Sequence, residues 1–211
     1  DPTSISADAL LVATGRRATF DGLNLEAADV QTSARGVVVD DRLRTSNRRI
    51  FAAGDVCGGA QFTHAADAMA RIVVQNALFH GRRRASELVI PSCTFTEPEV
   101  AHVGMSQADP ARGGADTITV DLADVDRAVI AGQTRGFVRV HHRSGRIAGA
   151  TIVGPGAGEL ISILVSMLQQ KRTLADLSSA VFPYPTAALA LKRVGDVYQR
   201  QRLKPWMRTA L

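Results

Sequence analysis

The sequence predicts a protein that is α/β in its first part and α+β in its second, where the sheet is antiparallel. In the first part, an apolar run at 50–53 leads through a glycine into an amphipathic segment from about Thr63 to Phe79, the order of a strand, a turn and a helix. In the second part, strand-like runs at 137–142 and 147–153 flank the turn at 143–146, which predicts a hairpin.

Length and composition limit the class of protein that this sequence can form. The 211 residues can form one or two domains, and 45% hydrophobic with 21% charged residues is ordinary for a globular protein. The longest apolar runs are far shorter than a membrane span. No membrane partner is therefore expected. Because Asp1 is neither an initiator Met nor the start of a signal peptide, we expect a fragment of a longer protein.

The two cysteines give no metal or redox motif. Cys57 and Cys93 are far apart and form no C-x-x-C or C-x4-C pair, so their spacing indicates neither a zinc site nor a local redox disulfide. A reducing, cytoplasmic setting is the default, and a disulfide between the two stays open.

The positive charge lies mostly on arginine, and the net charge is +5. Arg82–Arg84 and the tail at 192–208 are the dense basic patches, and phosphate binding is one interpretation of them. No aromatic residue lies among the three arginines, and the tail alternates charge with apolar residues. A solvated linker and an exposed helix face are therefore the favoured interpretation, and we expect no nucleic-acid partner.

The first elements are expected to be short strands. The apolar run Ala9–Ala13 predicts a buried strand that ends in a glycine turn at Gly15. A loop is expected over 23–31, and the β-branched, glycine-led run at 36–40 predicts another strand.

The most informative stretch follows, at 45–64. Gly54 removes the side chain where a ligand would approach the backbone, and Asp55 comes at once after the predicted strand. A carboxylate there is costly unless something donates hydrogen bonds to it, and a polyol hydroxyl is suitable. The helix start that follows can turn backbone N–H groups toward an anion or a carbonyl. A plain strand–turn–helix unit with Asp55 as a turn residue is the alternative, and the residue types leave both open.

The second part begins at Pro91, after a linker. The run at 118–122 predicts a further strand. Gly154–Glu159 is not a dinucleotide fingerprint, because Glu159 stands where the third glycine belongs and Pro155 removes a backbone donor.

Three helices complete the predicted second part. The first, at 159–170, has an apolar face made of Leu160, Ile163, Leu164, Met167 and Leu168. A short helix over 173–179 has Thr173 as its cap and Asp176 three residues on. The last is expected to start at Pro185 and Thr186 and to run to about Leu203.

Four runs resemble one enzyme family. They are A-T-G-R at 13–16, T-S-x-x-x-I-F-A-x-G-D at 45–55, P-x-x-x-F-T-x-P-E-x-x-x-V-G at 91–104 and G-x-x-A-G-E at 154–159. Together they resemble the FAD-dependent pyridine nucleotide-disulfide oxidoreductases, the superfamily of dihydrolipoamide dehydrogenase, glutathione reductase and mercuric reductase. The resemblance implies the remainder of a Rossmann-like FAD/NAD(P) domain followed by a dimerisation domain. It implies that 1–16 end the NAD(P)-binding domain, 17–85 belong to the FAD domain and 86–211 form the dimerisation domain.

The resemblance also implies a cofactor site. Asp55 would bind a ribityl hydroxyl of FAD, and NAD(P)H would be the co-substrate. The other implied cofactor-binding residues are Gly15, Gly54, Gln61, Phe62, Thr63 and His64.

The family's acid-base pair is missing from the chain. Where the family usually has His-Pro-Thr, with Glu three residues later, this sequence has Tyr184 and Leu189. The F-P-Y-x-T segment at 182–186 resembles the mercuric-reductase branch, so Tyr184 is the catalytic candidate, although that branch's C-terminal cysteine pair is absent. The redox C-x4-C and both glycine fingerprints are also absent, and no metal site is expected.

The resemblance implies a parent enzyme that passes a hydride from NAD(P)H through FAD to a disulfide or metal-thiolate acceptor, a small-molecule or thiol substrate. The chain itself would supply part of the FAD site and a homodimer interface through 91–211. We do not expect the isolated chain to turn over or to bind FAD tightly. The alternative is a non-catalytic homodimerisation module.

Overall fold

The structure is a computed structural model, and it describes residues 4–109 and 113–203. The chain divides into two compact units with the boundary after Leu88. In the described segments, no helix combines the length and the hydrophobicity that crossing a bilayer requires.

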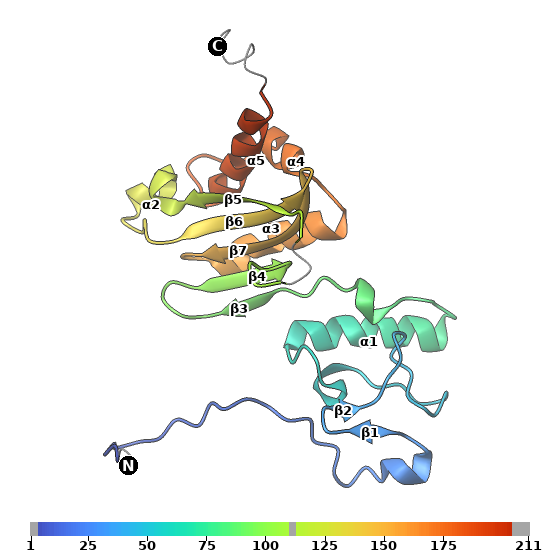
Figure 1. The fold of residues 1–211 in the computed structure, drawn as a ribbon. Coiled ribbons are helices and arrows are strands. Elements are labelled where there is room, and N and C mark those ends of the chain that lie inside the picture. Colours follow the sequence, from blue (N-terminus) through green and yellow to red (C-terminus); the bar gives the residue numbers. More distant parts are fainter. Residues whose placement is uncertain (1–3, 110–112, 204–211) are drawn as a thin grey trace. The chain divides into compact units, whose positions relative to one another are not determined.

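The first unit is built around one long helix (Figure 1). Helix α1, Thr63–Leu78, confirms the predicted amphipathic helix and buries Ala65, Ile72 and Asn76. Strands β1 and β2 form a two-stranded antiparallel ribbon. The regular elements of this unit are β1 Thr32–Ser33, β2 Gly36–Val37, α1, and 3-10 helices at Leu25–Ala28, Gly54–Cys57 and Ala85–Glu87.

Two strands predicted in this unit are wrong. Ala9–Ala13 has no regular structure, and Leu10 and Leu11 are 87% and 89% exposed. At 50–53 only an isolated bridge forms, between Arg44 and Phe51. A strand needs a neighbour for its backbone hydrogen bonds, and the described part of this unit holds no sheet beyond β1 and β2. For the same reason the strand predicted at 36–40 is limited to the two residues of β2. The segment at 23–31, which was expected to be a loop, contains a 3-10 helix.

The arginine run is anchored rather than loose. Asn76 of α1 is buried and donates to the carbonyl oxygens of Arg42 and Arg83 at 3.3 and 2.9 Å, while the Arg83 N–H donates back at 3.0 Å. Asp41 accepts from the Ser86 N–H and hydroxyl, both at 2.8 Å. The backbone of this basic segment is therefore fixed against the first unit, while its arginine side chains remain exposed.

The second unit is a five-stranded antiparallel sheet with helices on one face. The strand order is β3-β4-β7-β6-β5. The hairpin between β6 and β7 confirms the prediction, and its loop residues Ser144 and Gly145 have φ angles of 49° and 86°, as a tight hairpin turn requires. The strands are β3 Ser92–Thr94, β4 Val100–Gly104, β5 Asp116–Asp121, β6 Phe137–Arg143 and β7 Arg146–Val153.

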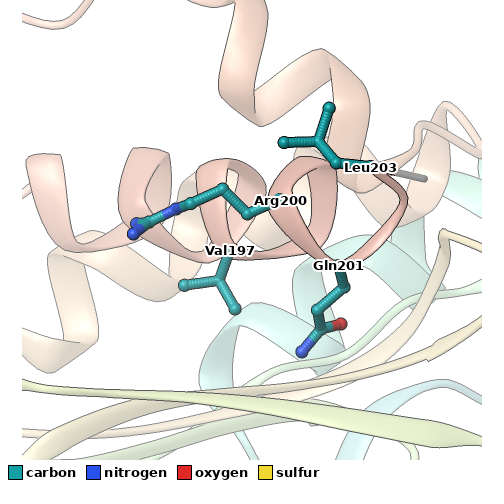
Figure 2. A pocket seen from close by; sticks show the side chains of 4 residues that line it. All are labelled: Val197, Arg200, Gln201 and Leu203. Carbon is teal, nitrogen blue, oxygen red and sulfur yellow. The ribbon is translucent and has the colours of Figure 1, made fainter. Parts of the chain in front are cut away.

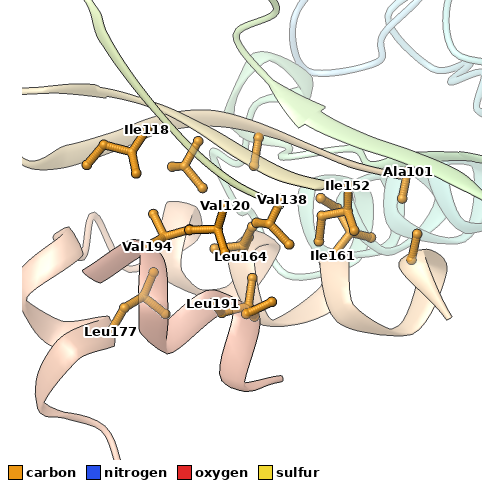
Figure 3. Packing of buried hydrophobic residues seen from close by; sticks show 14 of the residues in the cluster. Ala101, Ile118, Val120, Val138, Ile152, Ile161, Leu164, Leu177, Leu191 and Val194 are labelled. Carbon is orange, nitrogen blue, oxygen red and sulfur yellow. The ribbon is translucent and has the colours of Figure 1, made fainter. Parts of the chain in front are cut away.

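The core of the second unit lies between the sheet and these helices (Figure 3). Helix α3, Ala157–Gln169, packs on β4 and β7. Helix α5, Leu189–Gln201, packs on β5, on β6 and on helix α4, Leu174–Ser179. Fully buried Val138, Val140 and Ile152 on the sheet lie within the same hydrophobic cluster as Leu164 and Leu191. The helices are α2 Asp126–Ile130, α3 Ala157–Gln169, α4 Leu174–Ser179 and α5 Leu189–Gln201.

The helix predictions in this unit hold with small shifts. The capping box of α4 is present, with Thr173 and Asp176 bonded both ways. The predicted face of α3 omitted Ile161, which is 2% exposed, and α5 begins at Leu189 rather than at Pro185 and Thr186. The turn before α5 is instead closed by the Thr186 hydroxyl, which donates to the Pro183 carbonyl at 2.8 Å.

Candidate functional site

The predicted FAD-contact residues lie on consecutive elements of the first unit. Gly54 opens a 3-10 helix, is buried and has φ +80°. A Cβ there would lie 3.0 Å from the Ala66 Cβ in the first turn of α1. Only glycine therefore allows this backbone to approach the start of the helix as it does, which brings Asp55 to that end of α1.

Asp55 faces Arg16 across a long stretch of sequence. The Arg16 Nη1 lies 3.7 Å from the Asp55 Oδ2 and donates to the Gln61 backbone carbonyl at 3.3 Å. The Asp55 side chain is 46% exposed, so its oxygens keep room to accept further hydrogen bonds. No local pattern in the sequence signals the contact, because Arg16 and Gln61 are 45 residues apart.

The start of α1 carries a pair of stacked aromatic rings, and among the described residues no side chain caps its backbone N–H groups. Phe62 precedes the helix in an extended conformation and provides no side-chain cap. Its ring stacks on His64, with centroids 5.2 Å apart and planes 9° from parallel. Thr63, the first helical residue, is exposed. N–H groups at such a helix start are suited to a carbonyl or an anion.

Gly15 lies in an irregular, exposed segment. Its φ is +112°, which favours glycine, and a Cβ added there would meet nothing within 4 Å. The structure therefore places Gly15 beside the site through the contacts of its neighbour Arg16, and shows no close packing of its own.

This set of groups fits FAD. A half-exposed carboxylate suits a ribityl hydroxyl, the helix start suits a ring carbonyl, and a stacked aromatic pair suits a flat ring. Gly54, Asp55, Gln61, Phe62, Thr63 and His64 are the residues that would hold it.

Tyr184 belongs to the second unit, in the segment between α4 and α5, and is 70% exposed. A hydrogen bond with Asp126, and then the negative charge of that carboxylate, raise the pKa of Tyr184 above its usual value of 10.0. Asp126 is in turn paired with Arg193 of α5 at 3.2 Å. At neutral pH the phenol is therefore a proton-carrying donor and not a base.

Neither cysteine is a reactive thiolate in this structure. Both are free. Burial raises the pKa of Cys57, and burial together with the nearby Glu99 raises the pKa of Cys93. In the segments that the structure describes, no three metal-ligating side chains gather.

Three surface hollows of the described residues lie away from the predicted site residues. One of about 380 Å³, at the end of α5, is lined by Val197, Arg200, Gln201 and Leu203 (Figure 2). A second, of about 640 Å³, runs along the C-terminal half of α1. A third, of about 300 Å³, lies beside the glycine turn before α3. None of the three is lined by Asp55 or Tyr184.

Comparison with known proteins matches both units. Residues 1–70 match the profile described as pyridine nucleotide-disulphide oxidoreductase, and residues 90–194 match the dimerisation domain of the same proteins. The chain is 37% identical over 199 residues to the mercuric reductase of Streptomyces lividans, covering 92% of this chain and 42% of the relative. It is 33% identical over 193 residues to dihydrolipoyl dehydrogenase 3 of Haloarcula marismortui, covering 89% of this chain and 40% of that protein.

Solved structures agree. The flavoprotein disulfide reductase RclA from Escherichia coli superposes with a TM-score of 0.83 at 28% identity, over 90% of this chain and 45% of that one. LpdA from Mycobacterium tuberculosis gives a TM-score of 0.81 at 28% identity, over 86% and 41%. The chain thus spans 31–42% of the length of such curated relatives. With both profiles matched and the fold shared, the chain belongs to the pyridine nucleotide-disulphide oxidoreductase family.

Proposed function

We propose that the protein to which this chain belongs is a FAD-dependent oxidoreductase that takes a hydride from NAD(P)H and passes the electrons to a disulfide or metal-thiolate acceptor. The observation that carries the proposal is the half-exposed Asp55 carboxylate at the start of α1, on residues that match the family. The similarity to mercuric reductases supports an acceptor of the metal-thiolate kind. A cytoplasmic location stays a prediction from the cysteine usage.

In this proposal the first unit holds the flavin. FAD, when bound, supplies the hydride chemistry between nicotinamide and acceptor. Asp55 would accept a hydrogen bond from a ribityl hydroxyl and so hold that chain. The start of α1 at Thr63 and His64 would offer backbone N–H groups to a ring carbonyl, and the Phe62 ring would cover part of a flat ring bound there.

Tyr184 is proposed to act as a hydrogen-bond donor near the acceptor. The Asp126 carboxylate keeps the phenol protonated, because it raises the Tyr184 pKa by hydrogen bonding and by charge. The phenol has a single hydrogen, so donation to a thiolate or to an oxygen of the substrate would replace its hydrogen bond to Asp126. Tyr184 replaces the histidine of other family members at the position, but not in the base role.

The second unit is proposed to form a homodimer through residues 91–211. Residues 90–194 match the dimerisation-domain profile, and the unit leaves large apolar side chains exposed. Phe95 and Val181 are 82% and 96% exposed, and Val129 and Ile130 are 55% and 64% exposed. The same exposed side chains favour a second possibility, that the chain by itself serves only for pairing. Sedimentation tests both, and a strictly monomeric species at high concentration contradicts pairing.

The flavin assignment is tested on the full-length gene product that contains this sequence. Asp55→Ala is expected to weaken FAD binding about tenfold or more, the cost of a lost hydrogen bond to a charged group. Asp67→Ala is the matched control, since Asp67 is an exposed carboxylate on α1 paired with Arg71 at 2.8 Å. FAD titration followed by flavin fluorescence gives both affinities. Equal affinities for wild type and Asp55→Ala contradict the proposal.

A further inference from the structure

We propose that Arg16 is a positioning residue of the FAD site, which holds the Asp55 carboxylate and the Gln61 backbone carbonyl in the arrangement that receives the flavin. The inference rests on the proposed FAD function and adds a residue that the predicted site did not include. Arg16 follows Gly15, in a segment without regular structure.

A single guanidinium nitrogen joins the two ends of the loop. The Arg16 Nη1 donates to the Gln61 carbonyl at 3.3 Å and lies 3.7 Å from the Asp55 Oδ2. Asp55 precedes the glycine pair Gly58–Gly59 and Gln61 follows it. Arg16 therefore contacts both ends of the loop that leads from Asp55 to the start of α1.

The backbone of the same loop is fixed from another side by the β1–β2 turn. A Cβ at Gly58 would lie 2.6 Å from the Arg35 carbonyl oxygen, and a Cβ at Gly36 would collide with the Val56 carbonyl oxygen. These contacts hold the loop backbone but do not touch the Asp55 side chain. Within residues 4–109 and 113–203, the side chain that faces that carboxylate is Arg16.

The ion pair of Arg16 and Asp55 is exposed to solvent, and this exposure limits its contribution to folding stability. The side chains of Arg16 and Asp55 are 70% and 46% exposed. An ion pair so open to solvent adds little to folding stability, because water and salt screen it. Its effect is expected instead on the binding of a ligand that needs Asp55 in one orientation, because preorganised groups lose less freedom on binding.

Arg17 supplies a matched control. It is the next residue, also exposed, and makes no hydrogen bond or ion pair within the described part of the chain. Replacing either arginine removes one positive charge from the same segment. A difference between the two variants therefore reports the contact and not the net charge.

The test is a double-mutant cycle on FAD affinity in the full-length gene product, using Arg16→Ala, Asp55→Ala and the double variant, with Arg17→Ala as control. Arg16→Ala is expected to weaken FAD binding about twofold to fivefold, the range of an exposed charge pair. In the Asp55→Ala background the same change is expected to have little further effect. Arg16→Lys is expected to restore part of the affinity, and about 1 M salt to shrink the coupling.

The outcomes separate the inference from the proposed function. If Asp55→Ala leaves FAD affinity unchanged, the proposed function fails. If Asp55→Ala weakens binding while Arg16→Ala matches Arg17→Ala, or acts equally with and without Asp55, the inference on Arg16 is overturned and the function stands. A loss of unfolding stability in Arg16→Ala that accounts for the loss of affinity also overturns it, since Arg16 would then be structural.

Discussion

Replacing Gly195 by alanine tests the packing that holds the second unit together. Gly195 lies in the middle of α5 and is buried against α4. An added Cβ would collide with the Ser178 amide nitrogen, and it would lie 2.7 Å from the Leu174 carbonyl oxygen and 3.0 Å from the Leu177 carbonyl carbon. All three are backbone atoms of the neighbouring helix, so no side-chain rotation can relieve the contact.

Two effects of opposite sign decide how much Gly195→Ala changes the free energy of unfolding. Alanine is favoured over glycine in a helix interior by about 1 kcal/mol. Overpacking a filled core costs about 1–3 kcal/mol and occasionally more, and contact with three backbone atoms belongs at the upper end. Gly195→Ala is therefore expected to lower the free energy of unfolding by about 2 kcal/mol, although helix propensity alone predicts stabilisation.

Urea unfolding followed by circular dichroism measures this change. Gly158→Ala in α3 is the matched control, because the three atoms nearest to its Cβ would be side-chain atoms, the Cys93 Sγ at 3.2 Å, the Glu99 Oε2 at 3.5 Å and the Phe95 Cε1 at 3.6 Å, and the last two are ordinary van der Waals contacts. The control is expected to change stability by less than about 1 kcal/mol. A Gly195→Ala protein as stable as wild type or more stable would refute the packing of α5 on α4.

Three further predictions concern titratable groups. Burial lowers the pKa of His142, so stability is complete above the unfolded value of about 6.5 and declines as the pH falls from there toward the folded value; urea unfolding at about pH 7.5 and pH 5 should show the loss, and His142→Gln should reduce it. In a Tyr198→Phe background, the absorbance titration of Tyr184 should give a pKa above 10.0, which Asp126→Asn lowers, and an unchanged titration would remove Asp126 as its partner. Hydrogen bonds from the backbone and hydroxyl of the α4 cap lower the pKa of Asp176, so Asp176→Ala should cost about 0.5–1 kcal/mol at neutral pH and less as the pH falls below about 3.8; an equal cost at both pH values would count against the capping box.

The features that the sequence predicted well depend on local chemistry. The turn Ser144–Gly145 and the cap formed by Thr173 and Asp176 are specified within four residues, and both are present. The strands expected at 9–13 and 50–53 failed because an apolar run indicates a preference for burial but not the neighbour that would cover it.

The contacts of the candidate site also divide into those between residues close in sequence, which could be predicted, and those between distant residues, which could not. Resemblance brought together Gly54, Asp55 and the start of α1, which are close in sequence. The contacts of Arg16 with the loop cross 45 residues, and that of Asp126 with Arg193 crosses 67. Such pairs are set by the fold as a whole, and no spacing rule within one chain segment signals them.

The flavin assignment is tested most directly by a crystal structure of the full-length gene product with FAD bound. We expect an Asp55 carboxylate oxygen about 2.5–3.0 Å from a ribityl hydroxyl, the range of an O–H···O hydrogen bond. An Asp55 side chain that points into solvent while the ribityl chain is held by other residues would contradict it.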